Sequence, residues 1–196
     1  MLGQPLSRAA RGALPATMMP RSENVGARNV LVIERRRLLG GLLGVPLALA
    51  WPSLGRAADE IDPVAEAAVG VELINAYRQA QGLAPLARSR RLDEAARAHA
   101  EDMARHDRFS HTSSDGTGAF DRIRSFYPYE TWLGENIGAG FRTAGAIVSA
   151  WQGSPAHNDN LLLAEFQAIG LAVAVNKAAT FCWYWACDFG GQRDLD

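Results

Sequence analysis

The sequence predicts an α+β protein whose helices come first and whose strands come last. In several segments between residues 64 and 163, apolar residues recur at three- and four-residue steps, which is the period of an amphipathic helix. From residue 169 onward they alternate with polar residues or run continuously, as they do in strands. Because helices and strands are segregated along the chain, α+β is favoured over a doubly wound parallel sheet.

One ordinary domain is expected. The chain has 196 residues, of which 48% are apolar, and no repeated period, which is enough material for a single core. We place a short polar linker at residues 59–63, the domain at residues 64–190 and a C-terminal tail at residues 191–196.

The first 58 residues have the layout of an export signal. They hold eight arginines and only two acidic residues. Three arginines at positions 35–37 precede a Leu/Gly/Ala/Val run at 40–50, and small residues follow at 55–58. This resembles a twin-arginine signal that is cleaved near residues 57–58. The apolar run is shorter than the roughly 20 residues of a membrane span, although an uncleaved anchor is the alternative. We therefore expect export to the periplasm or the extracellular space.

The remaining chain is acidic, with 12 Lys and Arg against 19 Asp and Glu and a single lysine. Nucleic-acid binding requires a basic face, so this partner class is not expected. No other segment is long and apolar enough to cross a bilayer, so the mature part is not expected to span a membrane.

Three helices are predicted in the first half of the domain. The first runs from residue 64 to the Gln81-Gly82 stop, and the second from residue 91 to about residue 107. The second carries His99 on its apolar stripe, where a buried, hydrogen-bonded histidine is more common than a metal ligand. A third, short helix is expected at residues 119–126, after a polar stretch from Ser110 to Gly118.

The middle of the domain is rich in glycine, and we expect a loop with a short extended piece at residues 132–141. Thr143 is placed to cap a helix. A further helix begins at Ser154 and Pro155, with serine as the cap and proline in the first turn. It should end near residue 163.

The last two segments, at residues 169–176 and 181–189, predict an antiparallel hairpin. Alternation places Trp183, Trp185 and Phe189 on one face of the last strand and Tyr184 on the other, which indicates a core-facing strand rather than a sugar-binding platform.

The two cysteines are expected to be free. Cys182 and Cys187 are five residues apart, which in one regular strand separates their Cα atoms by roughly 16 Å on opposite faces. A disulfide requires about 4.4 to 6.8 Å. Export would favour oxidation, but only a bulge or turn between the two residues would allow them to pair.

Several short motifs occur in one order along the chain. They are Leu73-Ile74-Asn75-Ala76-Tyr77-Arg78, Gly82-Leu83 to Pro85-Leu86, Phe109-Ser110-His111, Gly134-Glu135-Asn136-Ile137, W-x-x-S-P-x-H from Trp151 to His157, and Tyr184-Trp185 to Phe189-Gly190. In order and spacing the chain resembles bacterial proteins of the CAP superfamily, the SCP-like or pathogenesis-related-1-like domains. The likeness covers about residues 64–190.

The resemblance implies a secreted three-layer α-β-α sandwich with a cleft formed by His111, Glu135 and His157. Longer eukaryotic members place a second acid after the tryptophan of the W-x-x-S-P-x-H motif, where this chain has Ser154. For a fourth group the candidates are Asp115, Asp121 and Asp159, among which the sequence does not choose.

Two imidazoles and a carboxylate suit a divalent ion such as zinc, with room for water. They suit equally a base with an orienting acid, and Glu135 alone could accept backbone N–H groups instead. The spacings of 24 and 22 residues do not match a compact H-E-x-x-H motif, so the metal interpretation depends on the resemblance.

Two functions follow. The first is a binding module for a divalent metal, a lipid, or an envelope or protein ligand, in keeping with the lipid binding and extracellular signalling associated with the family. The second is a peptidase-like hydrolase that uses His111, Glu135 and His157 around an activated water. Binding is favoured over enzyme activity, because no complete set of nucleophile, base and orienting residue is evident.

Overall fold

The computed structural model describes residues 61–194. The predicted export signal, with its twin arginines and its cleavage site, lies outside the described residues. Within them the chain forms α1 (Pro63–Ala80), β1 (Ala87–Arg88), α2 (Arg90–His106), α3 (Ala119–Phe126), β2 (Leu133–Ala139), α4 (Ala144–Gln152), α5 (Pro155–Leu162), β3 (Ala168–Val175) and β4 (Trp183–Gly190).

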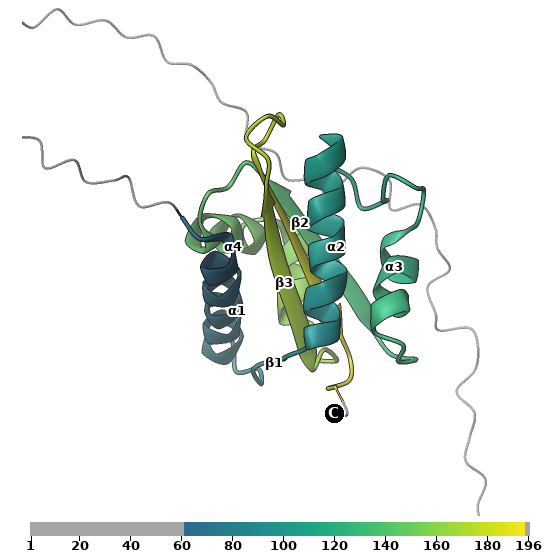
Figure 1. The fold of residues 1–196 in the computed structure, drawn as a ribbon. Helices are drawn as coiled ribbons and strands as arrows, with labels where there is room; N and C mark the ends of the chain where they lie inside the picture. Colours follow the sequence, from purple (N-terminus) through teal and green to yellow (C-terminus); the bar gives the residue numbers. More distant parts are fainter. Residues whose placement is uncertain (1–60, 195–196) are drawn as a thin grey trace, which may run out of the picture.

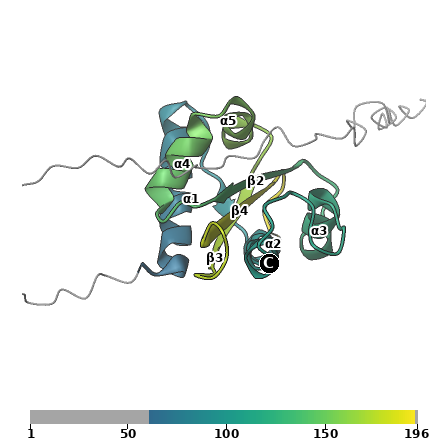
Figure 2. The same cartoon turned by 90° about the horizontal axis from the view of Figure 1, so that it is seen from above.

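These elements form three layers (Figures 1 and 2). A four-stranded sheet of order β1-β3-β4-β2 is the middle layer. Helices α1, α4 and α5 cover one face, and α2 and α3 cover the other. In the sheet, β3 and β2 are both antiparallel to β4, and β1 is parallel to β3. The predicted α+β sandwich and its closing hairpin are therefore confirmed.

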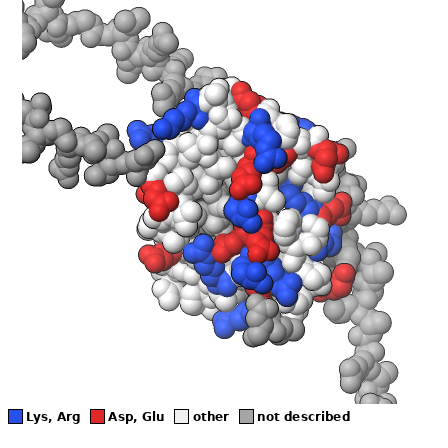
Figure 3. All heavy atoms as spheres, in the orientation of Figure 1, with Lys and Arg blue, Asp and Glu red and all other residues white. Residues whose placement is uncertain are grey.

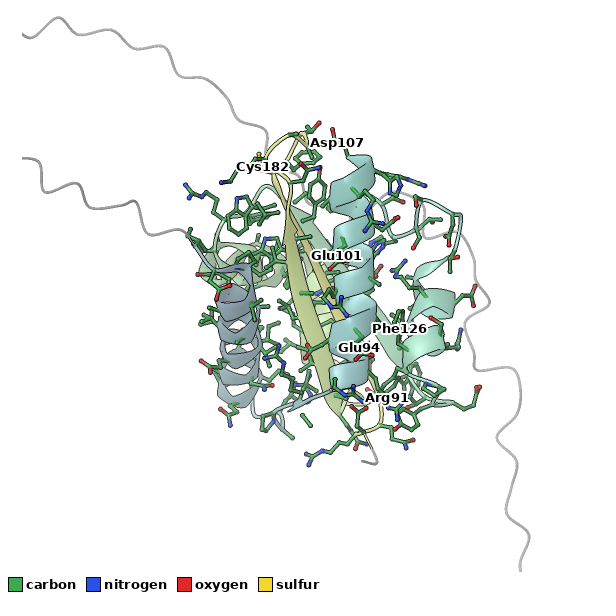
Figure 4. All side chains as sticks on the ribbon, viewed as in Figure 1. Arg91, Glu94, Glu101, Asp107, Phe126 and Cys182 are labelled. Atoms are coloured by element: carbon green, nitrogen blue, oxygen red, sulfur yellow. The ribbon has the colours of Figure 1, made fainter. Side chains whose placement is uncertain are left out.

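The helix boundaries follow local signals that the sequence displays. The Asp62 side chain accepts a hydrogen bond of 2.9 Å from Val64 N at the start of α1, and Gly82 follows the helix with a φ of 77°, as expected for a left-handed stop. Asp107 ends α2 in the left-handed region. Its carboxylate accepts from Thr180 N at 2.8 Å, which ties this helix end to the β3–β4 hairpin that carries Cys182 (Figure 4).

The glycine-rich segment was predicted as a loop with a short extended piece, but the extended piece spans most of the segment, so the loop assignment was wrong. The segment forms the seven-residue strand β2, paired with β4 along its length. The glycines are needed for packing: a Cβ at Gly134 would overlap Phe166, and one at Gly138 would overlap Ile147. Side chains from the neighbouring layer fill the space that larger residues would occupy, so glycine is compatible with a strand here.

The two faces of β4 pack into different cores, and the predicted core-facing positions are confirmed for Trp185 and Phe189, whereas Trp183 is only partly buried. Trp185 and Phe189 belong to the core beneath α1 and α4, whereas Tyr184 and Ala186 pack with α2. Burial of both faces makes the sheet the centre of the domain. None of the helices in residues 61–194 has the length and apolar character required to cross a membrane.

On the face shown in Figure 3, acidic and basic side chains are interspersed, and neither sign dominates. Two pairs on α2 contribute to this pattern, Arg90 with Glu94 at 3.3 Å and Arg97 with Glu101 at 3.6 Å. Both are exposed i,i+4 pairs, which stabilise a helix by only a few tenths of a kcal/mol, about 0.3–0.5.

Both cysteines are free, as predicted. Cys187 is buried in β4, and Cys182 is partly exposed just before that strand, with a φ of 62°. Burial raises the pKa of the Cys187 thiol well above its usual range, so this group is expected to be unreactive in the folded protein.

Candidate functional site

The centre of the candidate site is the carboxylate of Glu135 on the edge strand β2. Alternation along the strand directs Glu135 toward the α2 and α3 layer, together with Ile137, which packs against α2. Asn136 therefore faces the opposite layer. The Glu135 side chain is only 2% exposed, so its charge requires partners inside the protein.

His111 provides the first partner. It lies in the loop between α2 and α3, and its Nδ1 is 2.7 Å from Glu135 Oε1. Because a carboxylate only accepts hydrogen bonds, the imidazole donates from Nδ1. The His111 side chain remains 31% exposed. Local bonds shape this loop, including one of 3.1 Å from Thr112 N to Ser110 Oγ. His111 is therefore the partly exposed member of the pair.

Arg122 provides the second partner. It lies on α3, is 6% exposed, and forms an ion pair with Glu135 through its NH2 and Glu135 Oε2. Its NH1 donates to Ser113 Oγ at 2.8 Å and to the His111 carbonyl at 3.3 Å. The guanidinium thus joins α3, the His111 loop and β2.

Sequence reasoning missed Arg122, although a signal was present. Ala119, Ile123 and Phe126 recur at helical spacing, and Arg122 falls within the same stripe. A charged residue inside an apolar stripe indicates a buried ion pair.

His99 of α2 completes the cluster from above. It is fully buried, and its Nε2 lies 2.9 Å from the Ser110 carbonyl and 3.9 Å from Glu135 Oε2. Burial lowers the pKa of His99, so the ring is held neutral and donates to the carbonyl. The prediction of a buried, hydrogen-bonded histidine is confirmed, and the structure additionally places this ring against the site.

The electrostatics keep Glu135 ionised. Burial alone would raise the pKa of its carboxyl group, but the hydrogen bond from His111 and the nearby positive charge of Arg122 outweigh burial, so its pKa lies below the usual value. Asp188 of β4 carries a second buried carboxyl group, and this residue is paired directly with Glu135 on the adjacent strand β2. Burial and the charge of Glu135 raise the pKa of Asp188 well above its usual range.

His157 lies on α5, in the other helical layer (Figure 2). It is buried, and its Nδ1 is 2.8 Å from Ser154 Oγ. Ser154 does occupy the predicted cap position of α5, but it caps no backbone N–H. Its hydroxyl meets the imidazole instead, because the first turn of the helix places residues three apart side by side.

Asn136 connects β2 to the helix that carries His157. Its Nδ2 donates to the His157 carbonyl at 3.0 Å, and its Oδ1 accepts from Asn160 at 2.9 Å. Because Asn136 belongs to a strand, its side chain points across to α5, where it fixes the segment that carries His157.

The residues fit a metal ion only in part. His111 and Glu135 are in contact, but no group of three or more His, Cys, Asp or Glu side chains suited to a metal ion occurs within residues 61–194. The predicted sphere of His111, Glu135 and His157 is therefore not confirmed. The three aspartates considered as a fourth group, Asp115, Asp121 and Asp159, are all exposed.

Solved structures share this architecture. An extracellular protein from Bacillus anthracis str. Ames that contains an SCP domain is 26% identical with a TM-score of 0.58, over 67% of this chain and 41% of that chain. An outer surface protein from Borrelia burgdorferi has a TM-score of 0.60 at 22% identity, over 68% of this chain and 97% of that chain. At that identity the second likeness shows the fold alone.

Two relatives from Bacillus subtilis (strain 168) share part of the sequence. The protein YkwD is 42% identical over 102 residues, which are 52% of this chain and 39% of YkwD. The membrane protein YlbC is 31% identical over 103 residues, which are 53% of this chain and 30% of YlbC. The match thus spans less than half the length of either relative.

The family model described as "CAP: Cysteine-rich secretory protein family" matches residues 71–189. This range extends from α1 through β4 and includes every residue of the cluster around Glu135. Family match, fold and motif positions agree, and we conclude that the chain belongs to the CAP family.

Proposed function

We propose that this chain is exported and that its domain is a binding module in which His111 contacts the ligand. The hydrogen bond of 2.7 Å between His111 Nδ1 and Glu135 Oε1 carries this proposal. It fixes the orientation of the ring and leaves Nε2 as an acceptor on a side chain that is 31% exposed. A fixed, partly exposed polar group is what specific recognition requires.

Export is supported by the signal-like residues 1–58 and by the neighbouring structures, which are described as extracellular and outer-surface proteins. The ligand classes that fit such a location are a divalent cation such as zinc, a lipid, or another component of the cell envelope. The same observations support a periplasmic or extracellular location.

For a cation, His111 is the ligand that the geometry favours. A carboxylate that accepts from the other ring nitrogen is the usual support behind a metal-binding histidine. Glu135 acts as that support, because one of its oxygens is held by His111 and the other by Arg122. The remaining ligands would come from water or from a bound molecule, so weak cation binding is expected. The variant His157→Ala tests whether His157 contributes to cation binding.

The experiment is a calorimetric titration of the metal-stripped protein with zinc, using the wild type and the variants His111→Ala, His157→Ala and His106→Ala. His106 is a matched control, because it is exposed and its Nδ1 also lies near a carboxylate, 3.1 Å from Asp102 Oδ1. We expect saturable binding that persists in the control and is lost in His111→Ala.

Binding of anionic lipid vesicles, measured by co-sedimentation with the same variants, tests the lipid class. If neither zinc nor vesicle binding changes in His111→Ala, His111 is not the contact group and the proposal fails.

A second candidate, a peptidase-like hydrolase, is favoured by the same pair, because a histidine oriented by a carboxylate suits a general base that activates water. In that case His111→Ala abolishes peptide hydrolysis while the protein stays folded and His106→Ala retains full activity. Hydrolysis that survives in His111→Ala removes this residue from the mechanism.

A further inference from the structure

Asp188 is a buried carboxyl group in direct register with Glu135. The two residues are paired across β4 and β2, and Asp188 is fully buried. On its other side Asp188 pairs with Gly170 of β3. The backbone of α2 at Leu92 and Asp93 lies so close to Gly170 that a Cβ there would overlap it. Helix α2 therefore packs directly against this part of the sheet.

The hydrogen-bonding groups around Asp188 are not satisfied by the protein atoms described. Within residues 61–194, neither Asp188 oxygen has a hydrogen-bond partner, and neither does Arg122 Nε. Both oxygens of Glu135 are engaged, by His111 and by Arg122. A buried carboxylate without donors costs several kcal/mol, so the ionised form of Asp188 is poorly accommodated here.

Charge balance leads to the same conclusion. Arg122 carries one positive charge and Glu135 one negative charge, and the two compensate each other in an ion pair. Burial keeps the imidazole of His99 neutral, so it adds no positive charge. A second carboxylate would leave a net negative charge in a region without solvent. Two adjacent carboxyl groups commonly retain one proton between them for this reason.

We propose that Asp188 is a neutral carboxylic acid that donates its proton to Glu135, and that it is thereby a positioning residue for the Glu135–His111 pair. Directly opposite residues of an antiparallel pair have Cβ atoms about 4.5–5.5 Å apart, which is within reach of one hydrogen bond between the carboxyl groups. The raised pKa of Asp188, due to burial and to Glu135, agrees with this assignment.

The role as a positioning residue rests on the proposed function of His111, whereas the position of the proton does not. If Asp188 donates a hydrogen bond to Glu135, this bond helps to keep the Glu135 carboxylate in its orientation toward His111. The pair is then fixed from three sides, by Arg122, by His111 and by Asp188.

Infrared spectroscopy of the purified protein at pH 7 locates the proton without any ligand. We expect the carbonyl band of a protonated carboxylic acid, which shifts when aspartate is labelled with ¹³C and disappears in Asp188→Asn. The matched control is Asp121→Asn, because the Asp121 side chain is 81% exposed and its removal should leave the band unchanged. Absence of the band, or a shift only with ¹³C-labelled glutamate, overturns the proposal.

Nuclear magnetic resonance of His111 tests the positioning role. In Asp188→Asn the side-chain amide still donates to Glu135, so the His111 Nδ1 proton should keep its resonance. In Asp188→Leu this donor is lost, and solvent exchange of the Nδ1 proton should accelerate several-fold. An unchanged exchange rate in Asp188→Leu contradicts positioning. If neither variant folds, the isotope shift in the wild type still decides where the proton lies.

Because both measurements are made without zinc or lipid, their failure is distinct from a failure of His111 to bind a ligand. A protein that shows the aspartic acid band but binds neither zinc nor vesicles retains the proton assignment and loses the proposed function.

Discussion

Arg122 and Glu135 form an ion pair in which both side chains are almost completely buried, with 6% and 2% exposure. The pair joins α3 to the edge strand β2. Because Glu135 also accepts from His111, the ion pair fixes the histidine that we propose as the ligand contact.

Removing one partner of this pair should be costly. In an Asp188→Asn background, where Asp188 cannot ionise in place of Glu135, Glu135→Gln leaves the Arg122 guanidinium buried without a counter-charge, and an arginine does not lose its proton in a protein. We expect the free energy of unfolding to fall by about 3–5 kcal/mol, measured by urea denaturation. The control Asp121→Asn, at an exposed site on α3, should change it by less than about 0.5 kcal/mol. A loss below about 1 kcal/mol for Glu135→Gln would mean that the pair is not formed as described.

Stability should decline toward alkaline pH because of Asp188. Its pKa is raised in the folded state, so the folded protein holds a proton that the unfolded chain releases above about pH 4. This contribution is complete below the unfolded pKa and is lost as the pH rises toward the folded pKa. Glu135 acts in the opposite sense, because its lowered pKa gives stability that is lost as the pH falls through the folded value.

The substitution Asp188→Asn isolates the contribution of Asp188 to the pH dependence of stability. Urea denaturation of this variant and the wild type between about pH 5 and 8 should show the variant gaining relative stability as the pH rises, by up to about 1.4 kcal/mol per pH unit. Parallel pH profiles for the two proteins would show that Asp188 does not titrate differently in the folded and unfolded states.

Gly170 should not tolerate a side chain. A Cβ at this position overlaps the backbone of α2 at Leu92 and Asp93, and a backbone cannot move aside as a flexible side chain can. Gly170→Ala is expected to lower the free energy of unfolding by about 3 kcal/mol or more. Gly145→Ala is the control, because nothing lies within 4 Å of the place that its Cβ would take. That substitution in α4 should stabilise the helix by about 0.5–1 kcal/mol. An equal loss in the free energy of unfolding for both variants would contradict the close approach of Gly170 to the α2 backbone.

The two thiols should differ in reactivity. Cys182 is partly exposed, whereas Cys187 is buried with a raised pKa. In the folded protein, iodoacetamide should therefore modify Cys182 first, and intact mass should show a single label. Unfolding without a reductant should then give two labels. A protein that takes up no label after unfolding without a reductant carries a disulfide, and the free-thiol prediction would be wrong.

The sequence predicted the elements whose signals are local. The third helix, α3, begins and ends at the predicted residues, and the β3–β4 hairpin follows from alternation alone. Only a short extended piece was predicted where β2 forms, because the glycines of β2 are explained by Phe166 and Ile147, which lie outside the segment. Local propensity favours a loop in such a segment, and tertiary packing overrides it.

The site was predicted in part for the same reason. The motifs identified His111 and Glu135, which the structure brings together. Arg122 and Asp188 were missed, because a charged residue is normally read as exposed, and only the folded sheet places Asp188 opposite Glu135. His157 lies on α5 with its ring against Ser154, and its part in the site stays a prediction.

The most direct test of His111 as the ligand contact is ¹⁵N nuclear magnetic resonance of its imidazole, with zinc or anionic lipid vesicles added and with His106 as an internal reference. The geometry predicts a proton on Nδ1 in the neutral ring, held by Glu135, and a change at Nε2 of His111 but not at His106 when ligand is added. A neutral ring protonated on Nε2, or His111 signals that do not change with either ligand, would contradict the proposed role.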